Sequence, residues 1–269
     1  MTSRKSTGVP GGTLFGFAIL ESIGAGARTQ IHRVQDPDGT VCAMKHLRLR
    51  TATDRRFLAQ MRREHVVASS MTHAGIRSTH RLRLRRAPIR VAEAALLMEL
   101  IAGHALSEER PATVRRTVSL FLQLADSLSA LHENGWVHGD VTPSNLVVSD
   151  EKIILIDLGQ AARIGETKDR IQGTPGFMAA EQLKCAALSE RTDVFGFAAT
   201  MHWSLTGKVL DDSTPLEHVG ADLPDQLAGL LRSCLAVEPT SRPTNMAALT
   251  QTLEETQMAL DVEHGPNGP

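Results

Sequence analysis

Short apolar runs bounded by turn residues characterise the first hundred residues of the chain. Residues 15–23 read as a strand, and the glycine-containing stretch at 24–31 turns into a second strand. Asp-Pro-Asp-Gly at 36–39 predicts the next turn, and a third strand follows at 40–47. Arginine and leucine alternate at 81–85, which is typical of a half-buried strand, and residues 94–101 form another apolar strand. The pattern predicts consecutive strands joined by tight turns.

Helical periodicity occurs once in this part of the chain and dominates the part that follows. Apolar residues at helical spacing predict helices at 53–71, 113–134, 189–207, 224–237 and 246–260. Asn134-Gly135 is a typical end for the second of these helices. Residues 1–12 and 261–269 are expected to be tails, the first of them disordered, which leaves a folded region at 13–260.

Two short apolar runs, at 146–148 and 153–156, are flanked by polar residues that could form a site. Both are too short for helices, and Ser-Asp-Glu-Lys between them predicts a hairpin turn. Asn145 therefore leads into one strand and Asp157 leaves the next, so both are expected at the same end of a small sheet. With Asp140 nearby, their carboxylate and amide oxygens suit Mg²⁺ and a phosphate rather than zinc.

Charge is balanced over the whole chain but not along it. The 29 Lys and Arg residues nearly match the 30 Asp and Glu residues, so nucleic acid is not the expected partner. Residues 1–100 nevertheless hold 17 basic and 7 acidic residues (net +10), and residues 101–269 hold 12 basic and 23 acidic (net −11). Two lobes with different partners, or ordinary solvated faces, explain this asymmetry.

Cysteine usage and the N-terminal sequence indicate a compartment. Cys42, Cys185 and Cys234 are widely spaced and odd in number, so no disulfide framework or zinc site is indicated, which suits a reducing cytoplasm. The first residues lack the apolar core of a signal peptide, and no run approaches the roughly 18 apolar residues of a membrane span. We therefore expect a cytoplasmic protein without a membrane partner.

Several spaced motifs together resemble the protein kinase family. H-G-D-V-T-P-S-N followed by D-L-G resembles the kinase catalytic loop H-R-D-x-x-x-x-N and its D-F-G, and V-C-A-M-K resembles V-A-I-K on the third kinase strand. G-T-P-G-F-M-A-A-E is similar to the end of a kinase activation segment, and E-P-T-S-R-P to the motif whose arginine, here Arg242, pairs with the glutamate that corresponds to Glu181. The resemblance covers roughly residues 13–258 in the family's order.

The resemblance implies a fold. It is an α+β, bilobal protein-kinase-like architecture in which a small antiparallel sheet with one helix forms an N-lobe at about 13–100. A larger, mainly helical C-lobe follows at about 101–260.

The resemblance also implies a site that uses ATP and Mg²⁺. Asp140 would accept the proton of the substrate hydroxyl, and Lys45, paired with Glu64 on the helix, would contact the α- and β-phosphates. Asn145 and Asp157 would hold the metal. The nucleotide-contacting positions would be Ile23, Gly24, Ala25, Gly26, Ile31, Ala43, Lys45, Met98, Glu99, Ile101 and Val147.

Three departures from the family pattern bear on activity. Thr29 stands where the family's glycine loop has its third glycine, and Gly139 replaces the arginine that anchors a phosphate of the activation segment. Thr142 replaces a lysine near the transferred phosphate, a loss expected to cost about one to a few kcal/mol of transition-state stabilisation. Control through a segment phosphate bound at residue 139 is therefore not expected.

The motifs favour a serine/threonine protein kinase whose partners are protein substrates with Ser or Thr acceptors. One alternative is a nucleotide-binding pseudokinase scaffold, motivated by Thr29, Gly139 and Thr142. Another is a small-molecule phosphotransferase of the aminoglycoside-phosphotransferase type, because H-G-D without the lysine is similar to that family as well. Neither the physiological substrate nor the oligomeric state is indicated by the sequence.

Overall fold

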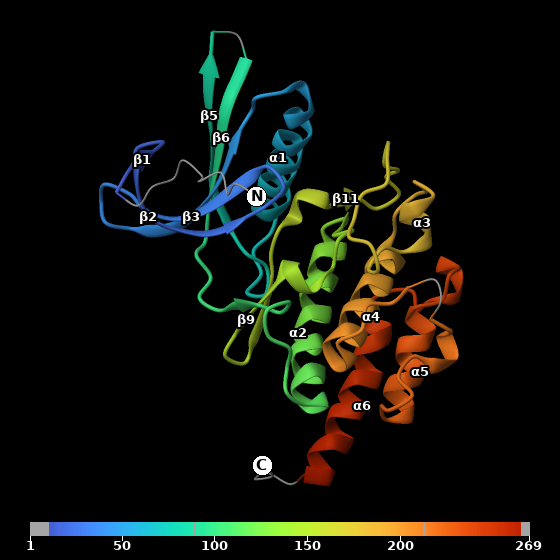
Figure 1. Cartoon of the computed structure of the whole chain (residues 1–269). Coiled ribbons are helices and arrows are strands. Elements are labelled where there is room, and N and C mark those ends of the chain that lie inside the picture. Colours follow the sequence, from blue (N-terminus) through green and yellow to red (C-terminus); the bar gives the residue numbers. More distant parts are fainter. Residues whose placement is uncertain (1–10, 89, 212–213, 265–269) are drawn as a thin grey trace, which may run out of the picture. The chain divides into compact units, whose positions relative to one another are not determined.

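The computed structural model describes residues 11–88, 90–211 and 214–264 (Figure 1). The tails expected at 1–12 and 261–269 lie largely outside these residues. The chain divides into two compact units. The first holds the chain up to Thr72 and Arg77–Ala102, and the second holds His73–Ile76 and the chain from Gly103 onward.

The first unit is an antiparallel sheet with one helix. Its strands lie in the order β1-β2-β3-β4-β6-β5. They are β1 (Thr13–Leu14), β2 (Phe17–Ala25), β3 (Thr29–Gln35), β4 (Val41–Arg48), β5 (Thr79–Ala87) and β6 (Arg90–Met98). The helix α1 (Arg55–Ser69) follows a 3₁₀ turn at Ala52–Asp54.

Side-chain alternation along β4 gives the two faces of this sheet different roles. Cys42 and Met44 belong to an apolar cluster with residues of β2, β3 and β6. Leu47 points to the opposite face, where it packs with Leu58 and Met61 of α1. Because side chains alternate, Lys45 shares the face of Leu47, and the packing of α1 brings the helix to the side of the sheet on which the Lys45 ammonium lies.

The expected strand at 15–23 is interrupted at its start. Phe15 and Gly16 have φ angles of +51° and +85°, and they form a turn that pairs Leu14 with Phe17. Arginines of β5 hold this turn: Arg83 donates to the Phe15 carbonyl oxygen at 2.9 Å, and the Arg85 guanidinium lies 4.8 Å from the centre of the Phe15 ring. The arginine face predicted for 81–85 is therefore partly used within the unit.

Two buried histidines should make the stability of the first unit depend on pH. His32 and His46 are 0% and 5% exposed. Burial lowers the pKa of His32, and burial lowers the pKa of His46 from 6.5 to about 4. Both rings therefore take up a proton less readily in the folded chain than in the unfolded chain, where histidine binds protons below about pH 6.5.

The free energy of unfolding should consequently fall as the pH drops below 6.5. His46 alone should lower it by about 2 kcal/mol at pH 5, because each pH unit below the unfolded pKa costs about 1.4 kcal/mol. Urea unfolding at pH 7.5, 6 and 5 measures the change. His46→Gln, which cannot be protonated, should flatten the dependence. An unchanged slope in that variant would refute the assignment.

The second unit is mainly helical. Its long helices are α2 (Val114–Glu133), α4 (Glu190–Thr206), α5 (Asp225–Cys234) and α6 (Ala247–His264). Helix α2 contacts α4 and α6, and α5 contacts α4 and α6 (Figure 1). Phe121 of α2 and Phe197 of α4 are fully or almost fully buried and meet edge to face, with ring centres 5.1 Å apart. Among the described helices, none combines the length and the apolar character needed to cross a membrane.

Two small sheets and several short elements complete this unit and carry its polar loops. One sheet pairs β9 (Leu146–Ser149) with β10 (Lys152–Leu155) and with β7 (His104–Ala105), and the other pairs β8 (Trp136–Val137) with β11 (Ala162–Arg163). The segment His73–Ile76 joins this unit because the Gly75 carbonyl oxygen accepts from Leu155 N–H at 2.8 Å. The hairpin predicted at 146–156 is therefore confirmed.

The predicted helices are all present, with shifted ends. The largest difference is at the last helix, which continues to His264 instead of ending at residue 260. In the sequence, Gly265-Pro266 follows directly, and this pair is a strong helix-stop signal. The apolar stripe that ends at Leu260 indicated where burial stops, whereas the stop signal indicated where the helix ends.

Candidate active site

The glycine turn between β2 and β3 is tight. Gly26 N–H donates to the Thr29 carbonyl oxygen at 2.9 Å, and a Cβ added at Gly26 would lie 2.7 Å from Thr29 Oγ1. Position 26 therefore has to be glycine because Thr29 is close beside it. The Gly26 amide is thus already bonded within the turn. Ile23, at the end of the approach to the turn, is 45% exposed.

Register places several nucleotide candidates in one row across the sheet. Gly24 lies opposite Ile31, and Ile31 lies opposite Lys45. Two positions before Lys45 on β4, Ala43 lies opposite Met98, and both are buried. Directly opposed residues of antiparallel strands project to the same face, so these side chains share the face on which α1 packs.

Lys45 and Glu64 form the predicted ion pair. Lys45 Nζ lies 2.7 Å from Glu64 Oε2, and their side chains are 12% and 2% exposed. The other carboxylate oxygen, Oε1, accepts from Arg77 Nη2 at 3.0 Å, and Arg77 is 9% exposed. The Glu64 carboxylate is thus held at both oxygens, and α1 is tied through it to β4 and to the segment that leads into β5.

Arg77 should support the position of the Glu64 carboxylate independently of Lys45. We expect Arg77→Met to lower the free energy of unfolding by about 2 kcal/mol, because it removes a buried hydrogen bond to a charged group. Removing Arg77 and Lys45 together should cost more than the sum of the single changes, because Glu64 would then be buried without any cation. Urea unfolding of the two single variants and the double variant gives the coupling free energy between Arg77 and Lys45. If the losses of the two single variants simply add in the double variant, this prediction is wrong.

The segment after β6 contains the other candidates of the first unit. Met98 is fully buried at the end of the strand, whereas Glu99 is exposed and Ile101 half-buried. Glu99 N–H donates to the Ser78 carbonyl oxygen at 3.1 Å, and its carboxylate accepts from the Ser78 hydroxyl at 3.0 Å. The Glu99 amide is therefore used within the unit, and the carbonyl oxygen of this residue is the group that remains for a ligand.

In the second unit, the Asp140 carboxylate is held by two segments that are far apart in the sequence. Thr174 Oγ1 donates to Asp140 Oδ1 at 2.8 Å, and Asn145 Nδ2 donates to Oδ2 at 3.1 Å and to the Asp140 carbonyl oxygen at 2.9 Å. The carboxylate is half-buried. It is therefore oriented from both sides while one edge stays accessible.

The backbone that carries Asp140 is held by the buried carboxylate of Asp193, near the start of α4. Asp193 is 1% exposed and accepts from His138 N–H at 2.7 Å and from Gly139 N–H at 2.8 Å. His132 Nε2 lies 2.8 Å from the same carboxylate. His138 Nδ1 in turn accepts from Asp140 N–H at 3.1 Å. His138 is therefore an internal support of the Asp140 backbone.

Asn145 and Asp157 lie at the same end of the β9–β10 hairpin. The Asn145 carbonyl oxygen accepts from Ile156 N–H at 2.9 Å, so Asp157 follows directly after that pair. Asp157 adopts a left-handed conformation with φ of +61°, and its Oδ1 accepts from Gly159 N–H at 3.2 Å. A non-glycine residue in that conformation is uncommon and concentrates at functional sites.

This arrangement fits a hard cation. The amide nitrogen of Asn145 is directed at Asp140, which leaves its carbonyl oxygen Oδ1 for a metal, and a carboxylate with an amide oxygen suits Mg²⁺. No group of three or more His, Cys, Asp or Glu side chains that could bind a metal occurs in the described part of the chain.

Thr142 and Val147 complete the candidate residues of this unit. Thr142 is 1% exposed, and its hydroxyl lies 3.1 Å from the Ser144 hydroxyl. It therefore presents no charge to a ligand. Val147 is half-buried on β9, opposite Ile154 of β10 and Ala105 of β7.

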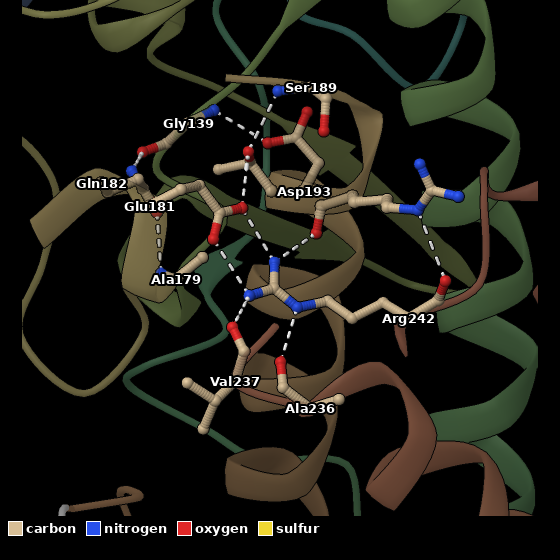
Figure 2. A network of polar contacts seen from close by, with 11 residues as sticks. Gly139, Ala179, Glu181, Gln182, Ser189, Asp193, Ala236, Val237 and Arg242 are labelled. Carbon is tan, nitrogen blue, oxygen red and sulfur yellow. Dashed lines mark hydrogen bonds and ion pairs between the residues drawn. The ribbon is translucent and has the colours of Figure 1, made fainter. Parts of the chain in front are cut away.

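A buried ion pair fixes the short helix α3 (Ala180–Leu183) (Figure 2). Arg242 Nη1 and Nη2 lie 2.8 and 3.0 Å from the two oxygens of Glu181, which confirms the predicted pairing. Three carbonyl oxygens accept the remaining N–H groups of the guanidinium, those of Ala236, Val237 and Arg191. The segment that ends with α3 is therefore anchored to the loop before α6.

Four polar residues with a clear structural role were not assigned one from the sequence: Arg77, Thr174, Gln182 and Asp193. Each acts through a partner at least 13 positions away. The only local signal at Asp193 was its place near the start of an apolar helix, and this gave no indication of a support for residues 138 and 139.

The sequence matches the model of the protein kinase domain over residues 17–254. It is 28% identical to the serine/threonine-protein kinase AfsK of Streptomyces coelicolor, over 84% of this chain and 30% of that protein. It is 28% identical to the serine/threonine-protein kinase PkaA of the same organism (85% and 48%) and 24% identical to the serine/threonine-protein kinase PknB of Mycolicibacterium smegmatis (88% and 42%). The chain thus spans less than half the length of these relatives.

Proposed function

Because this chain belongs to the protein kinase family, we propose that it transfers the γ-phosphate of ATP to serine or threonine side chains of a protein. The observation that carries the proposal is the Asp140 carboxylate, which Thr174 and Asn145 orient from two sides. The names of the relatives AfsK, PkaA and PknB specify serine and threonine as acceptors. This supports the same acceptor class for the domain described above.

Asp140 is the group proposed to receive the acceptor hydroxyl. Its carboxylate accepts a hydrogen bond from that hydroxyl and takes the proton as the hydroxyl oxygen bonds to the γ-phosphorus and the bond to the β–γ bridging oxygen breaks, which releases ADP. General-base assistance of this kind contributes about 10²–10⁴-fold to a rate. Because Thr174 and Asn145 limit rotation of the carboxylate, the accepting oxygen is positioned before the substrate arrives.

Lys45 is proposed to bind the α- and β-phosphates. Its ammonium is held by Glu64, and Arg77 keeps Glu64 in place from the other oxygen. The neutral, buried surface formed by Ala43 and Met98 suits an adenine ring, and the backbone at 99–101 supplies polar groups for its edge. Ile23, Gly24, Ala25, Gly26, Ile31 and Val147 are the further proposed nucleotide contacts.

Asn145 and Asp157 would hold Mg²⁺ through the amide oxygen of the first and the carboxylate of the second. When bound there, Mg²⁺ would neutralise charge on the phosphates. Thr142 is buried and uncharged, so this chain lacks one cation near the transferred group. We therefore propose a kinase that is slower than one with lysine at this position, by about tenfold or more. ATP as donor also supports a cytoplasmic location.

The experiment compares acceptors. The full chain is incubated with Mg²⁺ and γ-labelled ATP together with a generic basic protein, an aminoglycoside or choline. Label on serine or threonine of the protein, with none on the small molecules, is the expected result. Transfer to a small molecule but to no protein would replace the proposal with a metabolite phosphotransferase. Nucleotide binding without any transfer would replace it with a scaffold.

A further inference from the structure

The side chain of Gln182 uses its whole amide group to join separate segments of the second unit. Gln182 lies in α3 and is 6% exposed. Its Nε2 donates to the Gly139 carbonyl oxygen at 2.7 Å and to the Gln172 carbonyl oxygen at 3.3 Å, and its Oε1 accepts from Ala179 N–H at 3.0 Å. Figure 2 shows the side chain between Gly139 and Ala179. Both donors and the acceptor are therefore satisfied within the protein.

The two carbonyl groups that Gln182 joins belong to the backbone on either side of the candidate catalytic carboxylate. Gly139 directly precedes Asp140. Gln172 is two residues before Thr174, whose hydroxyl donates to Asp140 at 2.8 Å. Gln182 therefore holds the backbone next to Asp140 and the backbone two residues before Thr174, so it fixes both ends of the Thr174–Asp140 hydrogen bond.

The backbone around Gln182 leaves room for this side chain and for little else. Gly139 and Gly173 have φ angles of +72° and +134°, a region that disfavours side chains with a Cβ. A Cβ at Gly173 would lie 2.6 Å from Met178 Cγ and 3.2 Å from Gln182 Nε2. The amide of Gln182 thus occupies space that these two glycines leave open.

The surroundings of Gln182 are unsuited to a bound phosphate. A small cavity beside it is lined by amides, backbone and apolar groups, with Lys168 as the one cation among the described lining residues. Lys168 Nζ donates to the carbonyl oxygens of Gln160 and Ala161, at 3.2 and 3.3 Å. Its ammonium is thus directed at the backbone, and position 139 carries no side chain that could add a second cation.

We propose that Gln182 is a positioning residue that holds residues 172–174 against the Gly139–Asp140 backbone without any covalent modification of the segment. Through this contact it keeps the Thr174 hydroxyl at the Asp140 carboxylate. Activity should therefore not require phosphorylation of the segment between Gly159 and Ala179. The effect on rate rests on the proposed kinase function, whereas the clamp itself is a property of the fold.

The first test measures the clamp without using activity. Trypsin cleavage of the full chain after Lys168 and Arg170 is followed over time for wild type, Gln182→Leu and Gln182→Glu. Leu fills similar space without hydrogen bonds, and Glu keeps the shape but loses both N–H donors. Loss of two buried hydrogen bonds predicts cleavage about tenfold faster in both variants. Leu183→Ala, at the exposed neighbouring position, is the matched control and should match wild type.

The second test uses kinetics. Both Gln182 variants should show kcat lowered by about tenfold, with KM for ATP unchanged within about twofold, because a displaced segment affects transfer and not nucleotide binding. A general loss of fold would instead change both constants and the far-UV circular dichroism. Should Gln182→Leu fail to fold, Gln182→Asn keeps an amide but falls short of Gly139, and it gives the same comparison.

The third test addresses modification. Wild type treated with a phosphatase until it carries no phosphate should resist trypsin as well as untreated protein. Resistance that appears only after incubation with Mg²⁺ and ATP would overturn the proposal, and so would Gln182 variants with wild-type cleavage rates. If wild type transferred no phosphate at all, the proposed function would fail, and the trypsin comparison would still decide the role of Gln182.

Discussion

Asp140→Asn should reduce kcat by about 10²–10⁴-fold while the chain still binds nucleotide. The change replaces one carboxylate oxygen with an amide nitrogen, so the group can no longer take a proton from the acceptor hydroxyl. The side chain keeps its size. Asn145 can still donate to the remaining side-chain oxygen, and the Thr174 hydroxyl can turn to accept from the new NH2 group, so the variant tests the loss of the base more than a loss of orientation.

The measurement is initial-rate kinetics at saturating ATP, with the nucleotide dissociation constant determined in parallel. Asp150→Asn is the matched control, because it makes the same chemical change at an exposed residue of the β9–β10 turn. Asp150 has a φ angle of +52°, a conformation that asparagine tolerates, so this variant should retain wild-type activity. Activity of Asp140→Asn within tenfold of wild type would remove the carboxylate from its proposed role.

Arg242→Met should lower the free energy of unfolding by about 3–5 kcal/mol. Its guanidinium is 0% exposed and forms both hydrogen bonds to Glu181 as well as bonds to three backbone carbonyl groups (Figure 2). Without it, Glu181 stays buried. In the described part of the chain its carboxylate then keeps one side-chain partner, the Thr192 hydroxyl, which donates to Glu181 Oε1 at 2.9 Å. A charge left buried without a cation accounts for most of the expected loss.

Urea unfolding measures the loss, and an exposed ion pair of the same unit provides the control. Arg115 Nε lies 2.6 Å from Asp261 Oδ1, but their side chains are 49% and 45% exposed. Arg115→Met should therefore cost less than about 1 kcal/mol. Replacing Glu181 with leucine in the Arg242→Met background should restore part of the stability, since the buried charge is then gone. Equal effects of Arg242→Met and Arg115→Met would contradict this account.

The parts of the fold that depend on local pattern could be predicted from the sequence. The β9–β10 hairpin follows from two short apolar runs and a polar turn, and α2 follows from its apolar stripe and the Asn134-Gly135 end. The interruption of the first strand could not be predicted in the same way. It depends on a positive φ angle at Phe15, which Arg83 and Arg85 of a distant strand stabilise.

The residues of the candidate site likewise fall into those that the sequence predicts and those that it does not. The Lys45–Glu64 pair was predicted because Lys45 lies in a recognisable motif and Glu64 lies on the next helix, at the place where the family has its glutamate. Arg77 and Gln182 have no such motif, and each acquires its role only when a segment far along the chain folds against it. Polar residues of this kind look like surface residues in the sequence, and their burial is a result of tertiary packing.

The most direct test of the kinase assignment is transfer of label from γ-labelled Mg²⁺-ATP, followed by phosphoamino-acid analysis. Wild type and Asp157→Asn are compared, with nucleotide binding measured for both. Label on serine or threonine in wild type and its loss in Asp157→Asn is the predicted result, because that variant removes a carboxylate proposed to hold the metal. Wild-type chain that binds the nucleotide but transfers no label, or label that persists unchanged in Asp157→Asn, would contradict the assignment.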